Sequence, residues 1–175
     1  MPSDATDLRR ILIIGSAGSG KSTAARMIGD RLGLPVYHMD KEVFWLPGWE
    51  ERSRADQLDQ VKRVVAEEAW VFEGNNSRTF DIRIARARML IWLDLSITLR
   101  LWRVTRRAIL QNGQTRPDMA EGCEERIRML PAFWAFILRT NRDSRRKQKA
   151  LFEAVTLPKH RLTSARAVNA FVADL

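Results

Sequence analysis

Five short runs of apolar residues are spaced along the chain, and charged residues, glycine or proline bound each of them. Strands that are buried on both faces of a parallel sheet form continuous apolar runs rather than an alternation of apolar and polar residues. The runs therefore predict five strands, at residues 9–15, 35–40, 69–74, 88–94 and 151–157.

Apolar residues at helical spacing fill most of the segments between these runs. Residues 23–33 predict the first helix, and the almost wholly apolar stretch 131–138 predicts a buried helix that begins with proline. Three serines are positioned as N-caps of further helices: Ser53, Ser96 and Ser164. Strands that alternate with helices predict an α/β fold with a parallel sheet and right-handed crossovers.

The length of 175 residues suffices for one domain with a substantial core and is short for two. No apolar run approaches the roughly 18 residues that a membrane helix needs, and the first ten residues contain no apolar segment of a secretory signal. Cys123 is the only cysteine, which excludes a disulfide framework and a cysteine-based zinc cluster. We therefore expect a single cytoplasmic domain without a membrane partner.

The formal net charge is +9, and 24 of the 30 basic residues are arginine. The planar guanidinium group of arginine binds phosphate or carboxylate through two parallel hydrogen bonds. One explanation of the excess is an anionic partner, either a nucleotide or a nucleic acid. The other explanation is the coding bias of the genome.

The segment from Gly15 to Ser22 fits the pattern G-x-x-x-x-G-K-S, between the first predicted strand and the first predicted helix. In this pattern backbone N–H groups surround a phosphate at the positive end of the helix. Lys21 reaches the β- and γ-phosphates, and the Ser22 hydroxyl binds Mg²⁺. The alternative is a glycine-rich turn with a surface lysine. The sequence thus predicts a site for ATP and Mg²⁺ made of Gly15, Ser16, Ala17, Gly18, Ser19, Gly20, Lys21, Ser22 and Thr23.

Three further predicted strands each end in an acid: Asp40, Glu73 and Asp94. Ligands of open α/β sheets lie beyond the carboxyl ends of the strands, so all three acids are expected at the phosphate site. Glu73 and Asp94 are candidates for the magnesium shell, and Asp40 is the candidate that takes the proton from an attacking hydroxyl. The alternative is that such acids cap the next helix.

The turn after the third predicted strand has side chains suited to a phosphoryl acceptor. The amides offer donors and acceptors and the arginine offers a fork to an anion, although a plain turn also favours glycine and asparagine. Trp45 and Trp49 beside the PGW segment are suited to stacking a flat substrate, and core packing is the alternative. The predicted acceptor-binding residues are Asp40, Trp45, Gly74, Asn75, Asn76 and Arg78.

Arg100, Arg103 and Arg107 share one stripe of the helix predicted after Ser96, opposite its apolar face. Cations stabilise the charge that develops during phosphoryl transfer, but a charged stripe is also the usual form of a solvated helix face. The sequence leaves both interpretations open. Residues 111–123 break every periodicity and predict a mobile loop.

The chain resembles, over nearly its whole length, the small bacterial P-loop proteins of the DNA topology modulation family, which is grouped with adenylate kinase-related kinases. The resemblance is carried by the glycine-rich loop and by the segments LPVYHMD, PGW, EGNNSRT, LIWLD and TRPDMAEGC. More distantly, the order of parts is similar to adenylate and shikimate kinases. It implies a five-stranded parallel sheet in the order 2-3-1-4-5, a substrate-binding insertion over residues 41–69 and a lid over residues 111–128.

The resemblance also implies roles for single residues. Arg78 matches the arginine that adenylate kinases carry after a DG-x-P turn, Arg103 and Arg107 match arginines that enter the lid, and Arg116 lies within it. Glu73 stands where the family usually has aspartate. The insertion lacks the threonine-glycine and arginine features with which adenylate kinases hold AMP, so AMP is not the expected acceptor.

Together these patterns predict an ATP-dependent kinase that acts on a small, anionic nucleoside-like, nucleotide-like or metabolite acceptor. Its predicted catalytic residues are Lys21, Asp40, Arg103, Arg107 and Arg116. The alternative is a nucleic-acid-associated P-loop NTPase or binding protein, which the net charge of +9 favours although no nucleic-acid-binding motif is visible. A monomer and a homodimer are both compatible with the sequence.

Overall fold

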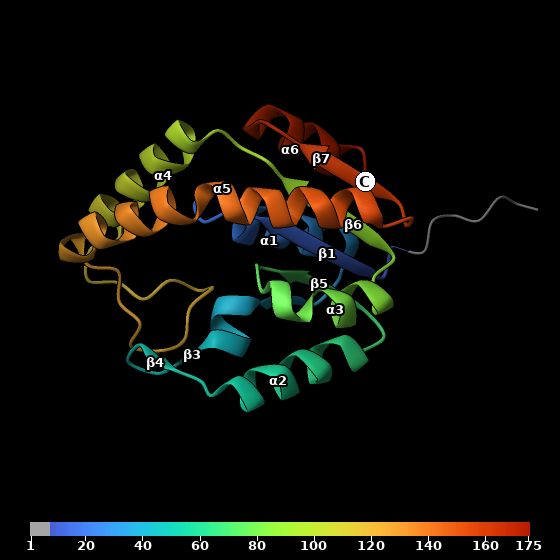
Figure 1. The fold of residues 1–175 in the computed structure, drawn as a ribbon, viewed down its shortest axis with the longest axis horizontal. Helices are drawn as coiled ribbons and strands as arrows, with labels where there is room; N and C mark the ends of the chain where they lie inside the picture. Colours follow the sequence, from blue (N-terminus) through green and yellow to red (C-terminus); the bar gives the residue numbers. More distant parts are fainter. Residues whose placement is uncertain (1–7) are drawn as a thin grey trace, which may run out of the picture.

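Five strands pair side by side in the computed structural model, which describes residues 8–175. They are Arg10–Gly15 (β1), Val36–His38 (β2), Trp70–Glu73 (β5), Met89–Leu93 (β6) and Lys159–Leu162 (β7). Each neighbouring pair is parallel, and the order across the sheet is β2-β5-β1-β6-β7 (Figure 1). Counted along the chain, these strands run 2-3-1-4-5, so the expected α/β fold and strand order are confirmed.

Helices cover both faces of the sheet. They are Lys21–Leu32 (α1), Arg54–Ala66 (α2), Phe80–Arg86 (α3), Ile97–Leu110 (α4), Leu130–Ala154 (α5) and Ala165–Ala173 (α6). Apolar side chains of α1 and α6 pack on one face, and those of α2, α3 and α5 pack on the other, while α4 contacts α5. Ile11 and Ile13 of β1 belong to the first core and Leu12 and Ile14 to the second, which is why this run is apolar throughout.

Short elements lie at the end of the molecule to which β1 points (Figure 1). A π-helical turn, Met39–Phe44 (η1), follows β2 and leads into a hairpin of Trp45–Leu46 (β3) and Glu50–Glu51 (β4). Two 3₁₀ turns, Ser77–Thr79 (η2) and Ile127–Met129 (η3), precede α3 and α5. Within the described residues, no helix has the length and apolar character needed to cross a bilayer.

The fifth strand is not at residues 151–157, where the sequence predicts it. Residues 151–154 are the last turn of α5, and the strand is β7. Leu151 and Phe152 pack from the helix onto the sheet, and a short apolar run does not by itself distinguish a buried helical turn from a strand. Because β7 lies at the edge and leaves His160 and Arg161 exposed, it lacks the apolar run of a central strand.

The helix predicted at residues 131–138 is present within α5, but it is not buried. Ile137 is fully buried, whereas Trp134, Phe136 and Leu138 are 41%, 43% and 57% exposed. Only one stripe of this helix packs against the rest of the protein, whereas its apolar residues extend around more of its circumference. Helix α3, which follows η2 after Asn75 and Asn76, was also not predicted from the sequence.

Candidate active site

The loop that joins β1 to α1 adopts backbone conformations that favour glycine. Gly20 caps the N-terminus of α1 with a left-handed backbone (φ 88°). Gly18 has φ +79°, and a β-carbon there would lie only 2.8 Å from the carbonyl oxygen of Arg100. Glycine is therefore needed both for the turn and for the close approach of α4. The first N–H groups of α1 have no intrahelical acceptors, which suits this helix end to an anion.

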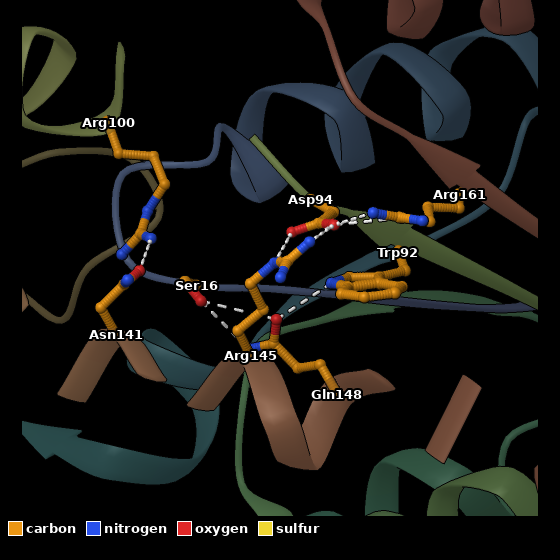
Figure 2. Close-up of polar contacts among 8 residues, drawn as sticks. All are labelled: Ser16, Trp92, Asp94, Arg100, Asn141, Arg145, Gln148 and Arg161. Atoms are coloured by element: carbon orange, nitrogen blue, oxygen red, sulfur yellow. Dashed lines mark hydrogen bonds and ion pairs between the residues drawn. The ribbon is translucent and has the colours of Figure 1, made fainter. Parts of the chain in front are cut away.

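Two arginines of α4 hold this loop in place. The Arg100 side chain is buried and donates Nε to the carbonyl oxygen of Ala17 at 2.8 Å. Its Nη1 donates to Oδ1 of Asn141 in α5 at 2.6 Å (Figure 2). Arg103 donates Nη1 to the carbonyl oxygen of Ser19 at 3.1 Å. This part of the arginine stripe therefore faces the loop rather than solvent.

Asp94, at the end of β6, is engaged by arginines on two elements (Figure 2). Arg145 of α5 donates to both carboxylate oxygens at 2.8 and 2.9 Å, and Arg161 of β7 donates to Oδ2 at 2.6 Å. Partial burial raises the pKa of Asp94, but the two guanidinium groups outweigh it, so the net pKa lies below its ordinary value. Both oxygens of Asp94 thus hold together α5, β6 and β7, and its predicted magnesium role stays a prediction.

Glu73, at the end of β5, lies beside the predicted magnesium ligand. Ser22 Oγ donates to Glu73 Oε1 at 2.9 Å, and His38 Nδ1 lies 2.9 Å from the same oxygen. Magnesium at phosphate sites keeps several waters and takes one or two protein oxygens, so Ser22 and Glu73 fit its needs. Among the described residues no group of three or more His, Cys, Asp or Glu side chains could hold a metal ion by itself.

Asp40 is the second residue of η1, the turn after β2, and lines the cavity described below. Burial raises the pKa of its carboxyl group, and the neighbouring charge of Glu73 raises it further. Lys21 and Arg116 act in the opposite direction without cancelling the rise. A carboxylate with an elevated pKa close to the loop lysine has the properties of a general base.

The turn after β5 is fixed to the glycine-rich loop and to its own helix. Asn75 donates Nδ2 to the carbonyl oxygen of Gly15 at 2.7 Å and accepts from the Gly15 N–H at 3.3 Å. Gly74 has φ +128°, and a β-carbon there would collide with the Met39 side chain at 2.2 Å. Gly74 and Asn75 also line the cavity. Their contacts within the protein already account for a glycine and an asparagine at these positions, without any contact to a substrate.

Arg83 has a part in this turn that the sequence did not predict, because the helix that carries it was not predicted. It is fully buried and donates to the carbonyl oxygens of Gly74 and Asn76 at 2.8 and 3.0 Å. Asn76 is therefore held through its backbone and does not line the cavity. Arg78 is exposed and also lies outside the cavity lining.

Carboxylates of the loop between α4 and α5 pair with the predicted phosphate-binding arginines. Arg116 Nη1 lies 2.9 Å from Asp118, and Nε lies 3.0 Å from Glu125. Arg107 Nη2 lies 3.0 Å from the same Glu125 oxygen. The three side chains Arg107, Arg116 and Glu125 therefore form one cluster at the cavity.

Asp118 brings this loop to α1, next to the glycine-rich loop. Its carboxylate lies 3.9 Å from Nη1 of Arg26 in α1. Burial raises the pKa of Asp118, but the neighbouring Arg116 guanidinium and Ser22 hydroxyl outweigh this effect, so the net pKa is lowered. A single acid in an irregular segment carries no spacing signal, and Asp118 is not among the predicted site residues.

One cavity of about 1340 Å³ connects these groups. Residues 17–23 of the loop and α1 line it, together with Asp40, Arg103, Arg107 and Arg116. The site residues that the sequence predicts thus converge here, except that Gly15, Ser16, Glu73, Asn76, Arg78 and Asp94 are outside the lining. Of these exceptions, Glu73 still reaches the cavity through Ser22.

Trp45 and Trp49 line the same cavity and also pack against each other. Their ring centroids are 5.3 Å apart at an interplanar angle of 77°. Both pack on a small cluster of Met119, Ala120 and Cys123 from the loop between α4 and α5. The two interpretations of these tryptophans, substrate stacking and packing, are therefore compatible.

Comparisons with known proteins give the fold and no closer relationship. No protein-family model and no curated protein matches the chain. Among solved structures, shikimate kinase from Acinetobacter baumannii is similar with a TM-score of 0.56 and 15% identity, over 97% of this chain and 91% of that one. Deoxyadenosine kinase from M. mycoides with bound dATP has a TM-score of 0.56 and 13% identity, over 94% and 97%. The chain therefore has the fold of P-loop kinases.

Proposed function

We propose that this protein is an ATP-dependent phosphotransferase that moves the γ-phosphoryl group of ATP to a hydroxyl group of a small molecule. The observation that carries the proposal is the single cavity shared by the loop lysine, three arginines and Asp40. A phosphoryl-transfer site needs a phosphate cradle, cations for the developing charge and a base near the attacking hydroxyl. The fold shared with shikimate and deoxyadenosine kinases supports the same conclusion.

Each side chain has a defined task in the proposed reaction. The N–H groups of the loop and Lys21 hold the β- and γ-phosphates of ATP. Arg103, Arg107 and Arg116 neutralise charge on the transferred group, for which Arg107 and Arg116 exchange their carboxylate partners for phosphate oxygens. Asp40 accepts the proton of the acceptor hydroxyl as the oxygen attacks.

Magnesium, when bound with ATP, neutralises phosphate charge and orients the γ-phosphoryl group. Ser22 and Glu73 are the residues that would hold it, directly or through water. His38 fixes the orientation of Glu73 through the bond to Oε1. Asp94 is not assigned to the ion.

The alternative of a nucleic-acid-associated NTPase rests on the net charge of +9. Binding to DNA through phosphate contacts weakens steeply with salt, by about 0.9 log units per log unit of salt for each contact. If the affinity for DNA does not depend on salt, the alternative loses its support, and the positive charge is explained by nucleotide binding.

The test of the proposed function is the substitution Lys21→Ala. We expect the variant to unfold at a temperature close to that of the parent, because Lys21 lines the cavity and is not among the core residues. Turnover of ATP should fall by a factor of about 10² or more, since charge-assisted bonds to phosphate contribute about 1.5–3 kcal/mol and strengthen in the transition state. Lys62→Ala on the exposed face of α2 is the matched control. Near-normal turnover at saturating ATP in Lys21→Ala would contradict the proposal.

A further inference from the structure

We call the residues between positions 40 and 75 that line the cavity the acceptor side, because their chemistry differs from that of the rest of the lining. They comprise a carboxylate at the strand end, three aromatic side chains, a second carboxylate on β4 and the turn after β5. The glycine-rich loop, α4 and α6 supply other parts of the lining. In the proposed reaction the acceptor side meets the molecule that receives the phosphoryl group.

The aromatic part of the acceptor side is held rigidly. Trp49 donates its backbone N–H to Cys123 Sγ at 3.3 Å and its Nε1–H to the carbonyl oxygen of Glu124 at 3.3 Å. Trp45 packs edge-on against it, and Phe44 adds a third ring to the lining. Fixed aromatic faces favour flat or apolar ring surfaces in a ligand, because stacking costs little conformational entropy.

The charged part of the acceptor side consists of Asp40 and Glu51, with no basic residue among lining residues 40–75. Ionised carboxylates only accept hydrogen bonds, so they favour ligands with O–H or N–H donors. They also repel a phosphate or carboxylate group at short range. This composition selects against an anionic acceptor.

The two cations that act on Asp40, Lys21 and Arg116, are engaged elsewhere. Arg116 is paired with Asp118 and Glu125, and Lys21 belongs to the phosphate loop. Arg78, on which the expectation of an anionic acceptor depends, is exposed outside the lining. Lys21, which has no such carboxylate partner among the described residues, is close enough to act on Asp40, so a cationic group beside Asp40 would meet its repulsion.

We propose that the acceptor is an uncharged molecule that combines several hydroxyl groups with a flat ring, which is the chemistry of a nucleoside. The aromatic wall of Phe44, Trp45 and Trp49 takes the ring, and Asp40 and Glu51 accept hydrogen bonds from the hydroxyl groups. The hydroxyl that meets Asp40 loses its proton to that carboxylate, its oxygen forms the new bond to the γ-phosphorus, and ADP leaves with the electrons of the broken P–O bond. This inference rests on the proposed phosphotransferase function.

The experiment incubates the protein with γ-labelled ATP, Mg²⁺ and a panel of matched acceptors. The panel contains ribo- and deoxyribonucleosides, their 5′-monophosphates, a carboxylated cyclic alcohol, an amino sugar and an acyclic polyol. We expect labelled product from at least one nucleoside, with kcat/KM at least about tenfold above that of its monophosphate and of the other compounds. Higher kcat/KM for any of those compounds, or no transfer to any nucleoside, would overturn the inference. Label found only in inorganic phosphate would instead overturn the proposed phosphotransferase.

A charge substitution makes the same test on the protein. Glu51→Lys places a cation on the acceptor side and should raise relative use of the monophosphate over the nucleoside about tenfold. Glu50→Lys changes the neighbouring residue, whose side chain is outside the cavity lining and points to the other face of the hairpin, and should leave the ratio unchanged. Equal ratios in the two variants would count against a role for Glu51.

The aromatic wall is tested in the same assay. Trp45→Leu should raise KM for the nucleoside about tenfold while KM for ATP stays within twofold. Trp102→Leu removes a tryptophan that is 60% exposed on α4 and outside the large cavity, and serves as the matched control. An unchanged nucleoside KM in folded Trp45→Leu would show that the ring does not lie against this wall.

Discussion

The negative charge of Asp40, which the proposed function needs, lowers the stability of the folded protein. Its pKa is raised by burial and by Glu73, so the folded protein binds a proton at Asp40 more tightly than the unfolded chain does. A group of this kind contributes stability that is present below the unfolded pKa and is lost as pH rises through the folded pKa. At neutral pH the charged carboxylate is therefore a cost to folding, as expected at a catalytic position.

The substitution Asp40→Asn should separate these two effects. The variant should be more stable than the parent to urea at pH 7, and the difference should shrink as pH falls towards the ordinary aspartate range, where both side chains are neutral. ATP affinity should stay within a few-fold, while phosphoryl transfer should fall about 10²–10⁴-fold because the base is lost. A stability gain that is equal at all pH values would rule out the proton linkage.

Local patterns were sufficient for the residues that act within one turn of chain. The loop from Gly15 to Ser22 and the N-caps Ser53, Ser96 and Ser164 lie where the sequence predicts them. Asp94 shows where this reasoning fails, because its arginine partners come from positions 51 and 67 residues away. Such a partner is decided by the packing of α5 and β7, and no local pattern contains it.

At the scale of elements, α5 holds the glycine-rich loop in place through side-chain hydrogen bonds. Gln148 in α5 donates Nε2 to Ser16 Oγ at 3.3 Å and accepts from Trp92 Nε1 at 3.0 Å (Figure 2). Asn141, two turns earlier, reaches the loop through Arg100. These buried bonds link the helix that follows the loop 111–126 to the phosphate cradle.

Arg100 is the residue through which this support should be measurable. Arg100→Met removes the bond to the Ala17 carbonyl and leaves Asn141 unpaired, so the loop loses its fixed position. We expect KM for ATP to rise about tenfold and the unfolding free energy to fall by about 1–3 kcal/mol. Arg106→Met on the exposed side of the same helix is the control. An unchanged KM for ATP in a folded Arg100→Met protein would show that α4 does not position the loop.

The lid proposed at residues 111–128 is joined to the hairpin of the insertion. Gly48 N–H donates to the carbonyl oxygen of Glu121 at 3.1 Å, and Cys123 Sγ donates to that of Leu46 at 3.6 Å. The structure shows this loop in contact with α1 through Asp118, although its sequence predicts mobility. The two segments are therefore expected to open and close as one unit.

Limited trypsin digestion tests this coupling, because the cleavable residues Arg126 and Arg128 lie in the lid. Cleavage there should slow several-fold when a non-hydrolysable ATP analogue and Mg²⁺ are bound, since phosphates add contacts to Arg107 and Arg116. Cleavage after Lys149 in α5 provides the reference, because Lys149 lies outside the cavity lining and its cleavage should not depend on the ligand. Equal lid cleavage with and without the analogue would argue against closure.

At the scale of the whole molecule, the alternation of apolar runs and helical segments was sufficient to predict the parallel sheet. The family resemblance predicts the order 2-3-1-4-5, and the pairing of the strands confirms it. The misplaced fifth strand and the missed α3 share one cause, which is that elements as short as β7 and α3 are fixed by packing and not by their own periodicity. The acceptor side also depends on packing, because it combines the insertion with the turn after β5.

The central claim is that the γ-phosphoryl group of ATP goes to a small molecule. The direct measurement incubates the protein with γ-labelled ATP, Mg²⁺ and a pool of small metabolites freed of macromolecules, and follows the label by chromatography. We expect label in an organic phosphate ester, formed by the parent protein and lost in Lys21→Ala. Label that leaves ATP only as inorganic phosphate, at a rate that added DNA increases, would contradict the proposed phosphotransferase and support the nucleic-acid-associated alternative.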